Sequence, residues 1–418
     1  MTTTESAPST AHVPDQPGLK LILTLGVMIT LGPLTIDMYL PALPDIEVDL
    51  ATTEAAVQLT LTGTLIGLAL GQLVVGPLSD AFGRRMPLVL GTLLHVLTSL
   101  LCLFAPSIGV LGALRVVQGA GAAATAVVTM AVVRDLYKGR AAALLISRLM
   151  LVLGVAPVLA PSIGGAVLRW TSWRGVFGVL AVLGLGLAVL GMLALPETLP
   201  PERRRRGTVR SISRAYRDLL RDSTFVGLVG VAGFTMASLF AYVSGSSFVM
   251  QDEFGLSEQT FGFVFGAGAI FLIGGTQLSA RLLRISTPDK ILMRSLMGAV
   301  AASGLFLVAA VADVGGIVVV LIPLWLVLGL SGIAMPNAPA IALSMHGEAA
   351  GTAAALIGAV RFGVGAAAAP FVGLLGNDAL AMAIVVAAGM VLALGSMAMI
   401  ASSPRLLEAS EDVEPLPA

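Results

Sequence analysis

Four charged side chains stand inside long apolar segments of this sequence: Asp37, Arg115, Arg148 and Arg361. A charge at the centre of a lipid bilayer costs about 2.5 to 3.5 kcal/mol on insertion scales, so it needs a partner or a water-filled cavity. A carboxylate in such a place can take up and release protons, whereas an arginine keeps its positive charge. These residue types therefore suggest transport that is coupled to proton movement.

Asp37 lies near the end of the first apolar segment and is followed by Pro41 and Pro44. We expect these prolines to disrupt the last helical turn, which frees carbonyl groups and lets the carboxylate face a cavity. We interpret Asp37 as a proton-binding residue. The competing interpretation is an ordinary acidic residue at the periplasmic end of a helix.

Arg115 lies in the fourth apolar segment, three residues before Gln118. This spacing puts the two side chains on one face of a helix. Arg115 can stabilise the ionised form of a nearby acid or bind its anion, unless its side chain extends to the membrane interface instead. Arg148 is close to the start of its segment and can reach the cytoplasmic surface, whereas Arg361 is deeper and harder to explain in this way.

The composition indicates an integral membrane protein. Of the 418 residues, 57% are hydrophobic and 11% are charged, whereas soluble proteins average about 25% charged residues. The 24 Lys and Arg residues balance the 24 Asp and Glu residues, which gives no indication of a nucleic-acid-binding surface. The sequence has no phosphate-binding loop of the form Gly-x-x-x-x-Gly-Lys-Ser/Thr, which excludes an ATP-driven pump carried on this chain.

Enzymatic functions are not indicated either. Cys102 is the single cysteine, and the three histidines, His12, His95 and His346, are far apart in the sequence. We therefore expect no metal site and no cofactor. The apolar segments contain no nucleophile with a neighbouring base, which argues against an intramembrane enzyme.

Twelve apolar segments are long enough to cross a membrane, because a spanning helix needs roughly 20 residues. They cover residues 19–42, 54–78, 86–105, 108–134, 141–168 and 173–195 in the first half, and 223–250, 258–281, 290–311, 315–340, 349–376 and 379–401 in the second. We expect an all-α membrane protein with two six-helix bundles, residues 19–195 and 223–401, related by a pseudo-two-fold repeat. A weak similarity between residues 52–76 and 257–275, each starting with a hydroxyl residue that could cap a helix, supports this repeat.

The distribution of charges predicts the orientation. Basic residues lie in the loops after even-numbered segments and in residues 196–222, a basic linker, whereas loops after odd-numbered segments are mostly acidic or neutral. The positive-inside rule puts the linker and both termini in the cytoplasm. Residues 1–18 and 402–418 are then cytoplasmic tails of a multi-pass protein in the cytoplasmic (inner) membrane.

Many of the 48 glycines lie inside the apolar segments, where small residues let helix backbones pack closely. The fifth segment concentrates Gly154, Pro157, Pro161, Gly164 and Gly165. Its prolines remove backbone donors and kink the helix. The segment is either a packing kink or a pivot between inward-facing and outward-facing states.

Together these motifs resemble the major facilitator superfamily over essentially the whole chain. Residues 76–85 are similar to its signature loop, although Ala81 stands where the family usually has a basic residue. The resemblance implies a cytoplasmic latch made by five residues of this loop: Gly76, Asp80, Gly83, Arg84 and Arg85. In this latch Asp80 caps or pairs at a helix end, Gly83 allows a tight turn, and the two arginines pair with acids on neighbouring helices.

Further matches narrow the resemblance. The segment around Arg115 is similar to the family's proton-coupling motif, and residues 154–165 are similar to its antiporter motif. Four segments also resemble the Bcr/CflA multidrug efflux group: residues 37–44, residues 133–136 with Arg134 and Asp135, residues 156–161 and residues 173–177. This resemblance implies a drug:proton antiporter that exports small amphipathic drugs or antibiotics by alternating access. Its implied partners are a drug-like molecule, protons and the lipid bilayer, with no nucleic acid, a monomeric state and the proton gradient in place of a cofactor.

The same resemblance implies that Asp37 and Arg115 couple proton movement and contact the drug. The full set of expected substrate contacts is Asp37, Tyr39, Arg115, Gln118, Phe240, Tyr242, Trp325, Arg361 and Phe362. The group usually has a neutral polar residue near position 361, so an arginine there could shift selectivity toward anionic or zwitterionic substrates. Two alternatives stay open: a proton-coupled exporter of one metabolite (an amino acid, sugar or siderophore), and a non-transporting membrane receptor.

Overall fold

The structure is a computed structural model, and it describes residues 18–137, 139–204, 209–312, 315–346 and 350–406. The described residues form helices, turns and short connections, with no strand among them. Nearly all of the expected N-terminal tail, most of the expected C-terminal tail and part of the basic linker lie outside the described residues. The all-α class expected from the sequence is confirmed.

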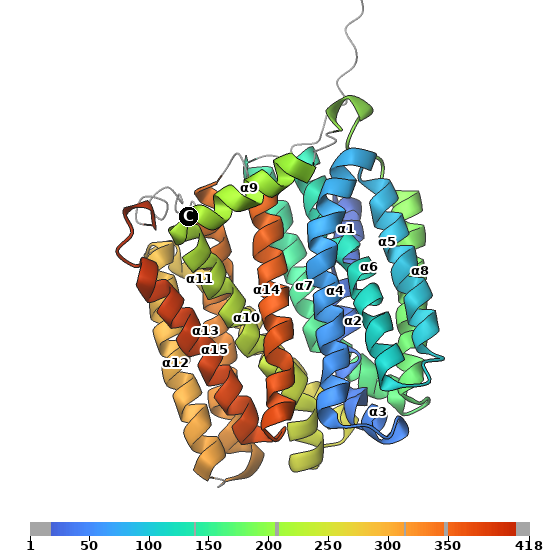
Figure 1. Cartoon of the computed structure of the whole chain (residues 1–418), viewed down its shortest axis with the longest axis vertical. Coiled ribbons are helices and arrows are strands. Elements are labelled where there is room, and N and C mark those ends of the chain that lie inside the picture. Colours follow the sequence, from blue (N-terminus) through green and yellow to red (C-terminus); the bar gives the residue numbers. More distant parts are fainter. Residues whose placement is uncertain (1–17, 138, 205–208, 313–314, 347–349, 407–418) are drawn as a thin grey trace, which may run out of the picture.

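Twelve helical stretches are long and apolar enough to cross a membrane. The first half contains a first span built from α1 (Leu19–Ile29), α2 (Leu31–Asp37) and α3 (Leu43–Asp49), followed by α4 (Glu54–Phe82), α5 (Arg85–Cys102), α6 (Ile108–Leu136), α7 (Gly139–Leu168) and α8 (Trp173–Ala194). The second half contains α10 (Ser223–Phe248), α11 (Glu258–Leu282), α12 (Pro288–Ala312), α13 (Gly316–Ser344), α14 (Ala350–Leu375) and α15 (Ala379–Ile400). Figure 1 shows the two sets of helices side by side, with α9 (Val209–Arg221) crossing near one end of the second set.

The first span differs from the expectation. Instead of ending near residue 42, it continues through a 3₁₀ turn at Leu40–Ala42 into α3. Pro41 and Pro44 sit at the first positions of these new turns, where a missing N–H costs little because the first helical N–H groups have no intrahelical acceptor. The prolines therefore restart the helix after Asp37 instead of ending it.

The first half is held together by a close crossing of α4 and α6. A Cβ atom on Gly67 would overlap the carbonyl of Val116, and a Cβ atom on Gly119 would overlap the carbonyl of Thr64. Backbone therefore packs directly on backbone, as small residues allow between membrane helices.

The second half repeats this crossing between α11 and α13. A Cβ atom on Gly275 would overlap the carbonyl of Gly329, and a Cβ atom on Gly332 would overlap the carbonyl of Leu272. Helix starts repeat as well, with Thr53 and Ser257 accepting hydrogen bonds from the residues three positions on. In the first half the cap is Thr53, one residue after the expected start at position 52.

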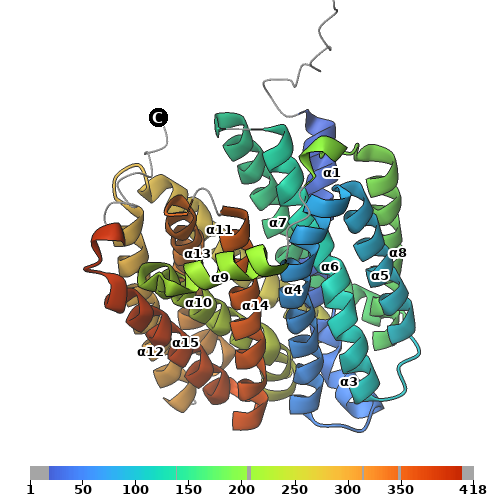
Figure 2. The same ribbon diagram turned by 45° about the horizontal axis from the view of Figure 1, so that its top comes forward.

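Two helix pairs join the halves, α4 with α14 and α7 with α11. Figures 1 and 2 both show α14 running beside α4. We call the end of the molecule that contains Arg84 the basic end and the end that contains Glu54 the acidic end. The basic end is at the top of Figure 1, where α4 finishes and α9 lies.

Candidate functional site

Asp37 is the last residue of α2, and its side chain is 6% exposed. Among the described carboxylates, Asp37 is the one that is buried, and no hydrogen bond or ion pair joins it to another described residue. It interacts electrostatically with Tyr242 of α10, which belongs to the other half. Asp37 is therefore a buried, unpaired acid that lies close to the junction of the two bundles.

The antiporter-motif stretch of α7 packs next to this acid. A Cβ atom on Gly164 would overlap the carbonyl of Met38, the residue after Asp37. On a neighbouring part of α7, a Cβ on Gly165 would lie 2.9 Å from the carbonyl of Glu258 in α11. The two adjacent glycines thus connect the helix that carries Asp37 to the second bundle.

The rest of this stretch also faces the second bundle. A Cβ on Gly154 would lie 3.1 Å from Ile273 of α11. Pro157 and Pro161 are both inside α7, which continues through them. The expected Gly/Pro set therefore lies along a helix that packs on α11 of the second bundle.

Arg115 of α6 is completely buried. Its Nη1 donates to the carbonyl of Thr35 at 3.1 Å and to Oε1 of Gln118 at 2.6 Å. The guanidinium carbon lies 4.4 Å from the ring centroid of Tyr39 and 5.6 Å from that of Phe177. These partners are neutral, and the positive charge is balanced by dipoles and aromatic faces instead of by Asp37.

A polar network extends from Arg115 to α5. Gln118 Nε2 donates to Ser99 Oγ at 2.7 Å, and Ser99 Oγ donates to the carbonyl of His95 at 2.7 Å. His95 Nε2 lies 2.9 Å from Thr35 Oγ1. The Thr35 hydroxyl already donates to the carbonyl of Leu31 at 2.6 Å, so His95 Nε2 carries the proton and donates to Thr35.

This site also contains Thr35, His95 and Ser99, which were not predicted from the sequence. Thr35 precedes Asp37 by two residues on α2, so the network fixes the helix that carries the acid. The available signal was that His95 and Ser99 are four residues apart, hence on one face of an otherwise apolar helix. Nε and Nη2 of Arg115 and Nδ1 of His95 remain buried without a partner in the described structure.

The expected substrate contacts of the second half form two groups. Phe240 and Phe362 are neighbours, with ring centroids 6.0 Å apart. Tyr242 and Trp325 both approach Gly268 of α11. The set is therefore divided between two places, and neither pair has a described ring contact with Tyr39.

Two arginines of the apolar segments stand outside these groups. Arg361 is half-buried on α14, and no ion pair or hydrogen bond joins its side chain to another described residue. Arg148 is exposed on α7. Tyr39, in contrast, is fully buried and its hydroxyl lies 2.7 Å from Thr60 Oγ1, so it belongs to the first bundle's interior.

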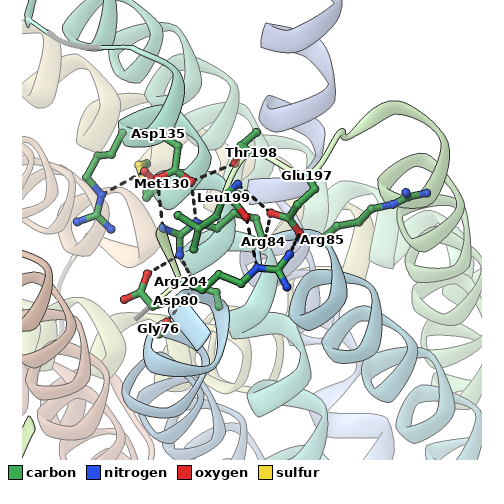
Figure 3. A network of polar contacts seen from close by, with 12 residues as sticks. Gly76, Asp80, Arg84, Arg85, Met130, Asp135, Glu197, Thr198, Leu199 and Arg204 are labelled. Carbon is green, nitrogen blue, oxygen red and sulfur yellow. Dashed lines mark hydrogen bonds and ion pairs between the residues drawn. The ribbon is translucent and has the colours of Figure 1, made fainter. Parts of the chain in front are cut away.

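The signature-loop residues form a compact cluster at the basic end (Figure 3). Arg84 Nε donates to Asp135 Oδ2 at 2.7 Å, and its Nη1 donates to Asp80 Oδ1 at 2.5 Å and to Ser79 Oγ at 2.8 Å. Burial by itself lowers the pKa of Arg84, but its hydrogen bonds to the carboxylates of Asp135 and Asp80 and their negative charges outweigh it and leave the pKa raised. Gly83 adopts a φ of +94°, which glycine tolerates best.

Glu197, after α8, completes this cluster and was not expected from the sequence. Its carboxylate accepts the backbone N–H of Arg84 at 2.8 Å, of Arg85 at 3.3 Å and of Leu199 at 3.0 Å. Partial burial raises the pKa of Glu197, but these backbone N–H groups and Arg204 outweigh it, so the pKa is lowered. Glu197 therefore holds the start of α5, where helix N–H groups have no intrahelical acceptor.

One expectation for this loop is wrong. Arg85 forms no ion pair with an acid in the described structure, and its Nη2 donates to the carbonyl of Met192. The reason is that Arg85 starts α5 and points toward the end of α8, where carbonyl groups are free. The other two expected residues, Gly76 and Arg134, lie at the edge of the Arg84 cluster. The Gly76 carbonyl accepts a hydrogen bond from the Ser79 hydroxyl at 2.9 Å, and Arg134 Nε donates to the Met130 carbonyl at 3.4 Å.

A third feature that was not expected from the sequence lies at the acidic end. Gln58 of α4 is fully buried, and its Nε2 donates to Asn377 Oδ1 at 2.6 Å and to the carbonyl of Ser244 at 3.4 Å. Its Oε1 accepts the N–H of Gly373 at 3.0 Å. Asn377 in turn donates to Glu54 Oε2 at 2.6 Å. We call these five residues the Gln58 closure; it joins the two bundles at the acidic end.

Comparison with known proteins supports a family assignment. Residues 25–370 match the family model of the Major Facilitator Superfamily. The chain belongs to the major facilitator superfamily. This member is a multi-pass membrane transporter, and its twelve spans agree with that assignment.

Several relatives of this superfamily member have names that refer to drugs. It is 37% identical to the uncharacterized MFS-type transporter YdgK of Bacillus subtilis, over 85% of this chain and 89% of the relative. It is 34% identical to a bicyclomycin resistance protein homolog of Haemophilus influenzae, over 82% and 86% of the two chains. It is 31% identical to a chloramphenicol resistance protein of Pseudomonas aeruginosa, over 80% and 79%.

Solved structures agree on the superfamily fold. A peptide transporter, POT, in complex with alafosfalin superposes with a TM-score of 0.74, at 16% identity, over 95% of this chain and 97% of that one. Identity at this level supports the fold alone. The resemblance to the Bcr/CflA group seen in the motifs is consistent with the named relatives.

Proposed function

We propose that this transporter is a proton-coupled multidrug exporter that works as a drug:proton antiporter. The observation that carries the proposal is Asp37, the buried and unpaired carboxylate of the described structure, near the junction of the bundles. An acid without a fixed ion-pair partner can exchange its proton for another charge or dipole during the cycle. The drug-resistance names of the relatives favour a drug as the exchanged molecule.

In the proposed cycle Asp37 binds a proton when the acidic end is open and releases it toward the basic end as a drug binds between the bundles. Opening of the acidic end requires the Gln58 closure to break. Arg115 keeps a fixed positive charge near α2 and stays in place through Gln118 and Thr35. Because drug and proton are not held together in one state, the gradient is not dissipated.

Energy for export comes from the proton gradient, with no cofactor in the cycle. Each tenfold concentration ratio corresponds to about 1.4 kcal/mol, so one pH unit supplies that amount for each proton. A membrane potential of 100 mV adds about 2.3 kcal/mol for each charge moved. We place the protein in the cytoplasmic (inner) membrane as a monomer, with both termini and the basic end in the cytoplasm, since the charge distribution follows the positive-inside rule.

The test is a drug-driven proton flux assay in liposomes with the purified protein. We expect several chemically unlike antibiotics to drive proton movement in the wild type and none to do so in Asp37→Asn. Asp45→Asn is the matched control, because Asp45 is an exposed acid on the same span. If a single metabolite drives proton movement and no drug does, metabolite export replaces drug export as the function. If no compound drives proton movement, the receptor alternative is favoured.

A further inference from the structure

Two buried hydrogen-bonding groups of the second bundle have no partner and point to the same place. The hydroxyl of Tyr242 and the indole Nε1 of Trp325 are buried and form no hydrogen bond in the described structure. A Cβ atom on Gly268 would lie 2.9 Å from the Tyr242 hydroxyl and 3.2 Å from Trp325 Nε1. The missing side chain of Gly268 therefore lets both groups pack closely against this turn of α11, where they converge.

The rings that carry these groups are fixed by α11. Tyr242 stacks on Phe265, with centroids 5.0 Å apart and an interplanar angle of 11°. Trp325 stacks on Phe271, with centroids 5.3 Å apart and an interplanar angle of 20°. Phe265, Gly268 and Phe271 follow one another at intervals of three residues, so they occupy neighbouring positions along one side of the helix. The two polar groups are thus held in place before any ligand arrives.

The chemistry of the pair selects the ligand. An indole N–H can only donate a hydrogen bond, and a phenol can donate one. A buried donor without an acceptor is unfavourable, so this arrangement is stabilised by a ligand that brings an acceptor. Tyr242 also interacts electrostatically with Asp37, whose negative charge disfavours an anionic acceptor.

We propose that Tyr242 and Trp325 form a recognition site for a neutral carbonyl-type oxygen of the cargo, with Gly268 allowing the two donors to converge. The proposal rests on the proposed export function and specifies its cargo: amphipathic molecules with an amide, ester or ketone oxygen. The cargo oxygen then accepts a hydrogen bond from Tyr242, which also interacts electrostatically with Asp37. Cargo recognition and proton binding thereby meet at one residue.

The experiment measures binding to the purified full-length protein in detergent, with two radiolabelled probes. Chloramphenicol is neutral and carries an amide carbonyl, and tetraphenylphosphonium has no hydrogen-bond acceptor. For chloramphenicol we expect Tyr242→Phe and Gly268→Ala each to raise Kd about tenfold, because the first removes a donor and the Cβ added by the second displaces both donors. The Kd for tetraphenylphosphonium should change less than twofold in both variants.

Gly274→Ala is the matched control on the same helix, because a Cβ at this position would meet nothing within 4 Å. It should leave the Kd of both probes unchanged. An equal loss for both probes in Tyr242→Phe, or no loss for chloramphenicol in either variant, would overturn the proposed recognition site. Transport in liposomes separates the two proposals: selective binding without any drug-driven flux would remove the export function and keep the site, whereas flux without selective binding would do the reverse.

Discussion

The number of protons exchanged per drug molecule follows from the burial of carboxylates. Asp37 is the buried carboxylate of the described structure, so the proposed cycle has one proton-binding group among the described residues. For a neutral drug exchanged for one proton, a difference of one pH unit balances a tenfold drug gradient, because each corresponds to a free energy of about 1.4 kcal/mol. A plot of the logarithm of the steady-state drug ratio against the imposed pH difference should therefore have a slope of one.

Proteoliposomes loaded with buffers of different pH supply the perturbation, and potassium with valinomycin on both sides holds the membrane potential at zero. Radiolabelled chloramphenicol reports the steady-state ratio at pH differences between zero and two. The wild type and Asp45→Asn should give a slope of one, and Asp37→Asn a slope of zero. A wild-type slope of two, which means a hundredfold ratio per pH unit, would refute the reasoning because it requires a second proton-binding group.

Three further predictions concern the Gln58 closure, the polar network that includes His95, and Glu197 in the Arg84 cluster. Gln58→Leu leaves the buried N–H of Gly373 without its acceptor, which destabilises the closed state of the acidic end by about 1 to 3 kcal/mol. Maleimide labelling of Ala369→Cys in a Cys102→Ala background should therefore become at least several-fold faster in this variant. An unchanged labelling rate would contradict the role of the Gln58 closure. His95→Leu removes the donor to Thr35 and should lower the chloramphenicol transport rate severalfold while the Kd stays within twofold; an unchanged rate would show that the network is not needed. The pKa of Glu197 is lowered by folding, so its contribution to stability is complete above its unfolded pKa of about 4.3 and is lost as pH falls through the lower folded value. The Tm advantage of the wild type over Glu197→Gln should be present at pH 7 and shrink progressively as the pH falls below about 4.3, and a constant advantage would be inconsistent with this sign.

The sequence allowed the prediction of features that depend on composition and spacing along one helix. Charge and hydropathy located the spans, and a charge inside an apolar segment identified Asp37 and Arg115 as unusual. The pairing of Arg115 with Gln118 followed from their three-residue spacing, because such neighbours share a helix face. The expected place of the Arg84 loop at a helix end followed from the resemblance of residues 76–85 to the superfamily's signature loop.

Features that depend on contacts between distant segments were not predictable in this way. Gln58 and Asn377 are more than 300 residues apart, and neither has a composition signal that links it to the other. Glu197 acts on backbone N–H groups, which every sequence has. The course of the chain after Asp37 was misjudged, because the prolines were assumed to end a helix although the first turn of a new helix accepts them.

The Gln58 closure also affects what comparison of related sequences can reveal. Two of its contacts across the bundle interface use main-chain groups, the carbonyl of Ser244 and the N–H of Gly373. Because a main-chain group stays the same whichever side chain is present, substitutions at 244 and 373 need not be compensated at 58. Correlated substitutions between aligned positions are the usual guide to which residues are in contact. They should therefore reveal the contact between positions 58 and 377 and fail to reveal the contacts of position 58 with positions 244 and 373.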